Sequence, residues 1–180
     1  FCQYRKFWST EKNNLFPKAI NELKPIVLTK IPNSYENFDV ILGDLHFINQ
    51  LKIMKFLKKG FKIIAKNPTY LFNKNKRNIK FHFDLMHGYN NLNKAIDLLD
   101  DENKKDFNDY VNSNVSFNPH NMFICKSKNL LKEYYSNLFP WLERCEKIFG
   151  FKDLKGFGKI RIYTFLAERF MPYWFNKNAK

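Results

Sequence analysis

The sequence predicts a domain of the α/β or α+β class, in which helices cover a small sheet. Short apolar runs, rich in β-branched residues and bounded by Pro, Asn or Gly, occur among longer stretches of helical period. The 180 residues fit one domain by length, and we see no internal repeat or second domain. We therefore expect residues 1–180 to form a single domain.

The apolar runs in the first half predict three strands. Residues 23–29 and 38–42 are β-branched runs that end at Asn, Pro or Gly, and residues 61–64 form a shorter run of the same kind. Residues 73–80 are rich in Lys and Asn without an apolar period, which indicates a loop.

A helix is expected over residues 46–59. Phe47, Leu51 and Met54 follow the spacing of one helix face, and Gly60 supplies a stop signal.

The second half predicts mainly helices around one strand. Residues 91–114 read as two helices broken near Asp100–Asp101, where an aspartate caps the second helix. A turn and a short strand are expected over 118–125, and a last helix over 159–175 with Pro172 near its end.

Ser127 is expected to cap a long helix with one apolar stripe. Pro140 lies inside this helix and should kink or divide it, because proline removes a backbone donor. The stripe consists of Leu130, Leu131, Tyr134, Leu138, Trp141, Leu142, Cys145 and Ile148.

The net charge of +14 invites a nucleic-acid interpretation, which we do not favour. Lys greatly outnumbers Arg, the residue best suited to phosphate and base contacts, and a composition rich in Lys, Asn, Ile and Phe suggests an AT-rich genome. Cys2, Cys125 and Cys145 form no CxxC pair, and an odd number of cysteines without a secretory signal indicates reduced thiols in a cytoplasmic protein. No signal peptide or membrane-spanning stretch is visible.

Asp44 and His46 follow the predicted strand 38–42 and form the first candidate site. A carboxylate and an imidazole at a strand end lie where α/β proteins bind ligands, and could hold a divalent metal or act as a base. Alternatively, Asp44 simply caps the following helix.

The densest polar cluster comprises His82, Asp84 and His87 within an aromatic segment. If the segment is extended, His82 and Asp84 share a face, and His87 follows at a turn that Gly88 permits. We predict that the three side chains share a pocket open to solvent, although a pair of satisfied, partly buried histidines is the alternative. The spacing matches no established zinc signature.

Asn118, His120 and Asn121 surround a proline before the strand at 122–125. They could present amide and imidazole groups to sugar hydroxyls, but turn chemistry alone would also select Asn and Pro.

The Glu168–Arg169 pair lies in an apolar helix, where charges are costly unless paired. Arg161 is seven positions before Glu168 and therefore near the same helix face, whereas Arg169 is about 100° away. We predict that Glu168 holds one arginine beside the 118–121 turn. The pair is either a structural clamp or a group that directs Arg161 or Arg169 at a diphosphate.

Taken together, four segments resemble a family of bacterial glycosyltransferases that usually sit in capsule and lipopolysaccharide gene clusters. The segments are 1–8, 118–125, 134–149 and 161–169, and the resemblance covers nearly the whole chain. In the first segment, Tyr4-Arg5-Lys6 resembles a Tyr-Arg-Arg motif of the family, with Gln3 where His is usual. In the second, Asn121-Met-Phe-Ile is the most recognisable feature.

The resemblance implies a GT-A-like mixed sheet covered by helices and a hexosyltransferase-like enzyme. It would move a sugar from a nucleotide-sugar donor to a growing capsular or lipopolysaccharide glycan, on the cytoplasmic face of the inner membrane. We expect Asp44, Asp84 and His87 to be catalytic. Substrate binding is expected of Arg5, Lys6, His46, His82, Asn118, His120, Asn121, Arg161, Glu168 and Arg169.

Many such enzymes hold Mn²⁺ or Mg²⁺ on an Asp-x-Asp triplet, which this sequence lacks; Asp44 is the candidate for a metal ligand. The chain begins on Phe1 without Met, so we expect the C-terminal part of a longer, N-terminally truncated protein. The alternative function is a non-catalytic carbohydrate-binding or partner-docking module of the same fold.

Overall fold

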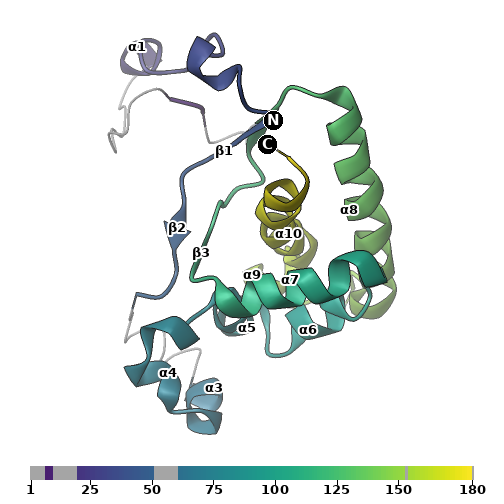
Figure 1. Ribbon diagram of the computed structural model, residues 1–180. Coiled ribbons are helices and arrows are strands. Elements are labelled where there is room, and N and C mark those ends of the chain that lie inside the picture. The colour runs from purple at the N-terminus through teal and green to yellow at the C-terminus, as the bar shows by residue number, and fades with distance from the viewer. Residues whose placement is uncertain (1–6, 10–19, 51–60, 153, 180) are drawn as a thin grey trace.

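A computed structural model describes residues 7–9, 20–50, 61–152 and 154–179 (Figure 1). It combines helices with short antiparallel strands, which confirms the predicted mixed class. In the described residues each sheet has two antiparallel strands. The GT-A-like arrangement of a larger mixed sheet stays a prediction.

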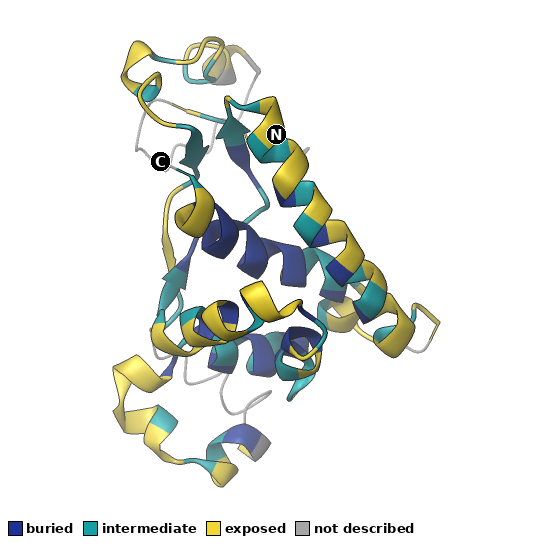
Figure 2. Cartoon of the chain, turned by 45° about the vertical axis from the view of Figure 1, so that its right-hand side comes forward, coloured by how far each residue is buried: buried dark blue, intermediate teal, exposed yellow. Residues whose placement is uncertain are grey.

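The helices between residues 79 and 178 form a body around one buried helix. Its members are α5 (Ile79–His87), α6 (Asn91–Ile96), α7 (Asp101–Ser113), α8 (Lys128–Phe149), α9 (Phe157–Ile160) and α10 (Ile162–Asn178). The helix α10 is buried along most of its length, because its sequence is apolar nearly all round. In Figure 2 it is the dark blue centre of the molecule, between α8 and the α5–α7 group.

Aromatic rings from α7, α8 and α10 fill the centre of this body. Trp141 lies with its ring centroid 5.8 Å from that of Phe107 and 5.0 Å from that of Phe170. Its indole Nε1 donates a hydrogen bond of 2.6 Å to the Ala95 carbonyl, so burial leaves no unsatisfied polar group on the ring. The last turn of α6 is thereby joined to the middle of α8.

Side-chain caps begin the helices where the sequence predicted them. Asp100 accepts from the Asn103 amide at 3.0 Å, and Ser127 accepts from the Leu130 amide at 3.2 Å. The break at Asp100–Asp101 and the Ser127 cap are therefore confirmed. The helix α8 continues through Pro140 and is not divided. Within the predicted stripe, Tyr134, Leu138, Trp141 and Cys145 are buried.

A two-stranded antiparallel ribbon runs beside the helical body. The strand β1 (Val40–Leu42) pairs with β4 (Phe123–Cys125), and β2 (His46–Phe47) pairs with β3 (Ser116–Phe117). Between the two ladders, residues 43–45 on one side face residues 118–122 on the other. The second strand thus carries two extra residues there, and such a bulge bends the chain out of the ladder.

Besides β1 and β2, the described residues before α5 contain short helical elements. These are α1 (Ile20–Leu23), η1 (Asn33–Tyr35), α3 (Phe61–Lys66), α4 (Thr69–Phe72) and η3 (Lys74–Lys76). Among the described residues, no helix has the length and apolar character needed to cross a membrane.

Several elements expected in the first 80 residues are wrong. In the expected strand 23–29, Leu23 ends α1 and only Val27 makes an isolated bridge. Residues 61–64 begin a helix, because an apolar run of four does not distinguish strand from helix. The expected 46–59 helix is absent at its start, where residues 46–47 pair as a strand; its remainder, 51–60, lies outside the described residues. The predicted loop 73–80 contains η3 and the start of α5.

Candidate functional site

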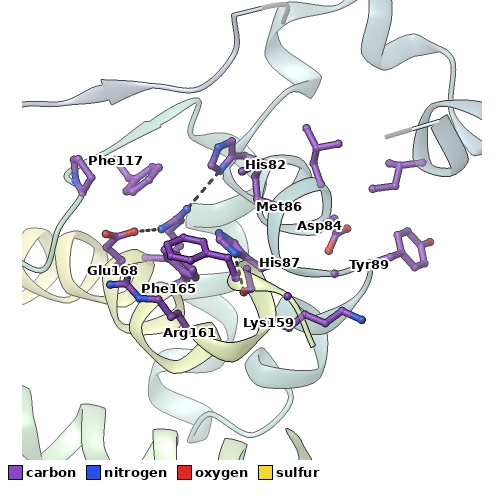
Figure 3. A pocket seen from close by; sticks show the side chains of 18 of the residues that line it. His82, Asp84, Met86, His87, Tyr89, Phe117, Lys159, Arg161, Phe165 and Glu168 are labelled. Atoms are coloured by element: carbon purple, nitrogen blue, oxygen red, sulfur yellow. Dashed lines mark hydrogen bonds and ion pairs between the residues drawn. The ribbon is translucent and has the colours of Figure 1, made fainter. Parts of the chain in front are cut away.

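An open pocket of about 910 Å³ lies between α5, the bulge of the ribbon and the α9–α10 junction (Figure 3). Rings and aliphatic groups supply most of its wall. Its charged and imidazole side chains are His82, Asp84, His87, His120, Lys155, Lys159, Arg161, Glu168 and Arg169. Seven of these nine are residues that the sequence predicted to be in the site.

The helix α5 brings His82, Asp84 and His87 to this pocket, as predicted. The segment is helical rather than extended, so the three side chains leave the backbone in different directions. In Figure 3, His82 lies on the side of Phe117 and Asp84 lies on the side of Tyr89. The cluster therefore spans the pocket instead of forming one compact group.

Asp84 is a buried carboxylate that already has partners. Lys80 Nζ lies 3.2 Å from Oδ2, and the Asn90 amide donates to Oδ1 at 3.0 Å. Burial raises the pKa of the Asp84 carboxyl above its usual value, although Lys80 and the Asn90 hydrogen bond act against this shift. The arrangement holds the turn after α5, where Asn90 adopts φ 63°.

His87 is fixed against α9 and α10. Its Nδ1 lies 3.1 Å from the Gly158 carbonyl oxygen, and its ring stacks on Phe165 with centroids 4.0 Å apart. The backbones of α5 and α9 lie in close contact here: a Cβ added at Gly158 would lie 2.2 Å from the Met86 carbonyl oxygen. Only glycine fits at position 158 without moving one wall of the pocket.

Glu168 and Arg169 form the predicted ion pair, and both are buried. Arg169 Nη1 donates to Glu168 Oε2, while Arg169 Nη2 lies 3.4 Å from His82 Nδ1. Because a guanidinium only donates, Nδ1 is the acceptor in this contact. The guanidinium carbon also lies 3.9 Å from the centroid of the Phe117 ring. Burial lowers the pKa of Arg169, and Glu168 opposes that shift.

The other oxygen of Glu168 holds the ribbon bulge. The His120 amide donates to Oε1 at 2.8 Å, which confirms that the pair packs beside the 118–121 turn. His120 and Asn121 both have positive φ, 77° and 49°. Asn121 Nδ2 donates to the Thr164 carbonyl at 3.1 Å, and Asn118 Nδ2 donates to the Gly43 carbonyl. Asn118 and Asn121 are not among the pocket-lining residues; their amides fix the bulge instead.

Arg161, Lys155 and Lys159 give the pocket a cationic wall. Arg161 precedes α10 with φ −103° and ψ 24°, and its guanidinium carbon lies 5.2 Å from the Phe157 ring centroid and 5.5 Å from that of Phe165. Arg161 therefore does not pair with Glu168, whose arginine partner is Arg169.

The remaining predicted residues lie elsewhere. Asp44 and His46 are exposed and are not part of the pocket wall; His46 contacts Phe117 edge-on at 6.4 Å between centroids. Asp44 caps no helix, because β2 follows it. Arg5 and Lys6 fall outside the described residues. Within the described ranges, no group of three or more His, Cys, Asp or Glu side chains could hold a metal ion.

Sequence reasoning missed Lys155, Lys159 and Phe157 as pocket residues. No motif marks this segment, and it reaches the pocket only because Gly158 lets α9 lie against α5. The available signal was an aromatic residue between two glycines, Gly156 and Gly158, with a lysine on either side.

The family comparison gives one match, to the family described as Domain of unknown function (DUF4422), over residues 1–179. The chain belongs to this family. The searches of curated proteins and of solved structures gave no match.

Proposed function

We propose that this DUF4422-family chain is a glycosyltransferase that moves a sugar from a nucleotide-sugar donor to a growing capsular or lipopolysaccharide glycan. One observation carries the proposal: a single pocket joins a cationic wall to exposed aromatic rings and buried polar groups. A nucleotide sugar presents the matching chemistry, since it has a diphosphate beside planar and ring-shaped groups.

The cationic wall suits the diphosphate. Lys155, Lys159 and Arg161 come from one short segment, and the first two are exposed. A guanidinium fork and ammonium groups would bind the donor and stabilise the charge that develops as the diphosphate leaves. Since Arg161 is already oriented by two rings, its positioning costs less entropy on binding.

Exposed aromatic rings at the pocket suit a sugar or a base. Tyr89 is 57% exposed and Phe157 is 70% exposed, so both rings of the pocket wall can stack on a bound sugar or base. Lys66 Nζ lies 4.5 Å from the Tyr89 ring centroid, so this ring is held at the pocket edge. Donor and acceptor could then be aligned by stacking and by the imidazoles of the wall.

A divalent metal does not fit the described residues. The carboxylates of the pocket are Asp84 and Glu168, and both have partners from Lys80, the Asn90 amide, Arg169 and the His120 amide. We therefore assign charge stabilisation to the cationic wall and derive no step through Mn²⁺ or Mg²⁺.

The same engaged carboxylates favour the second candidate, a non-catalytic carbohydrate-binding module. A pocket whose carboxylates are both held could bind a glycan without carrying out chemistry. Under the transferase proposal, the enzyme would act in the cytoplasm at the surface of the inner membrane, where its net charge of +14 favours anionic lipids.

The test is acceptor-dependent release of nucleoside diphosphate from a panel of nucleotide sugars, with glycan and lipid-linked acceptors. Lys159→Gln removes one pocket cation and should lower kcat/KM about tenfold or more. Lys132→Gln removes an exposed lysine of α8 outside the pocket and is the matched control. Glycan binding without release from any donor would favour the binding module.

A further inference from the structure

His120 differs in its setting from the other two pocket imidazoles. His87 is buried, stacked on Phe165 and held to the Gly158 carbonyl, while His82 accepts from the Arg169 guanidinium. The His120 side chain lines the pocket and is 41% exposed, so a bound substrate can reach it.

The position of His120 is set by its backbone. The two extra residues of the bulge bring it toward α10, and its φ of 77° is a conformation that a non-glycine residue adopts only when surrounding contacts hold it. The holding contact is the hydrogen bond of 2.8 Å from its amide to Glu168 Oε1.

The same Glu168 oxygen also faces the His120 ring. Oε1 lies 4.0 Å from Nδ1, and the second oxygen, Oε2, is fixed by the buried Arg169. A carboxylate beside Nδ1 favours the tautomer that carries its proton there, which leaves Nε2 as the proton acceptor. An imidazole oriented in this way by an acidic residue is the usual arrangement of a general base, and such contacts commonly tighten when substrate binds.

We propose that His120 is the catalytic base of the transferase and that Glu168 is its positioning residue. This inference rests on the proposed function and assigns the proton transfer to a residue other than Asp84 or His87. His120 Nε2 takes the proton of the acceptor hydroxyl as its oxygen bonds to the anomeric carbon. The bond from that carbon to the diphosphate oxygen breaks, and its electron pair leaves with the diphosphate. The proton then passes from His120 to solvent.

The kinetic test compares His120→Gln with the wild-type chain. Loss of the base should lower kcat by about 10²- to 10⁴-fold, with donor KM changed by less than about threefold. The fall of kcat/KM at acidic pH should disappear with the imidazole. A single displacement also inverts the anomeric configuration, so a product with retained configuration would overturn the proposal, as would a His120→Gln variant with wild-type kcat.

A second measurement separates this inference from the proposed function. Nitrogen NMR of the histidine rings should show His120 protonated at Nδ1 in the wild type, and Glu168→Gln should increase the share protonated at Nε2. An unchanged tautomer would overturn the role of Glu168. If the wild type releases nucleotide from no donor, the transferase proposal and the catalytic role of His120 fail together, whatever the tautomer shows.

Discussion

Replacing Gly158 by alanine should damage the pocket by forcing α9 away from α5. The added Cβ would lie 2.2 Å from the Met86 carbonyl oxygen, whereas ordinary contact begins at 3.4 Å, so the segments must separate by about 1.2 Å. Overpacking of this kind costs about 1–3 kcal/mol, and weakening the contact of His87 with the Gly158 carbonyl adds about 1 kcal/mol. The better helix propensity of alanine returns about 1 kcal/mol. We expect a net loss of about 1–3 kcal/mol.

Urea unfolding, monitored by circular dichroism, measures this loss of stability. Binding of a nucleoside diphosphate measures whether the pocket is intact. Gly43→Ala is the matched control, because nothing lies within 4 Å of its Cβ position and its φ is outside the left-handed region. It should stay within about 0.5 kcal/mol of the wild type. If Gly158→Ala is equally neutral and binds ligand normally, the close contact of α9 with α5 is not as described.

Three further outcomes follow from buried groups. Arg169→Met should lower the free energy of unfolding by about 3–5 kcal/mol, because the buried Glu168 carboxylate loses its cation. The double variant with Glu168→Gln should lose less than the sum of the two single losses, and additive losses in urea unfolding would contradict the ion pair. Burial raises the pKa of Asp84, so the wild type should become more stable relative to Asp84→Asn as the pH falls through that raised pKa toward about 4. A difference in unfolding free energy that changes in the opposite direction would contradict this prediction. Burial raises the pKa of Cys145 to about 12, so iodoacetamide at pH 8 should label it more slowly than the half-buried Cys125; mass spectrometry of the native protein would reveal the reverse order.

The parts of the fold that the sequence predicted are those set by local signals. The caps at Asp100 and Ser127 and the strand at 40–42 depend on residues within a few positions, and the structure has them. The failures at 46–47 and 61–64 are short segments whose state depends on distant partners. The partner of β2 is β3, which lies about 70 positions later in the chain, so the pairing leaves no local sequence pattern.

The candidate site divides in the same way. His82 and Glu168 stood out because polar groups in apolar segments require partners, and the structure places both in the pocket. Asp44 looked equally suitable but is exposed outside the pocket wall, because the strand it follows continues into a ribbon rather than a helix. The lysines of the wall could not be found, since their place depends on the close contact at Gly158.

The most direct test of the central claim is where a nucleoside diphosphate binds. Amide hydrogen exchange should be measured with and without the uridine, guanosine, adenosine and cytidine diphosphates. The pocket predicts slower exchange in residues 82–89 and 155–161 with at least one of them, and no change in α7, which lies outside the pocket. Protection confined to other segments, or none with any nucleotide, would contradict the account.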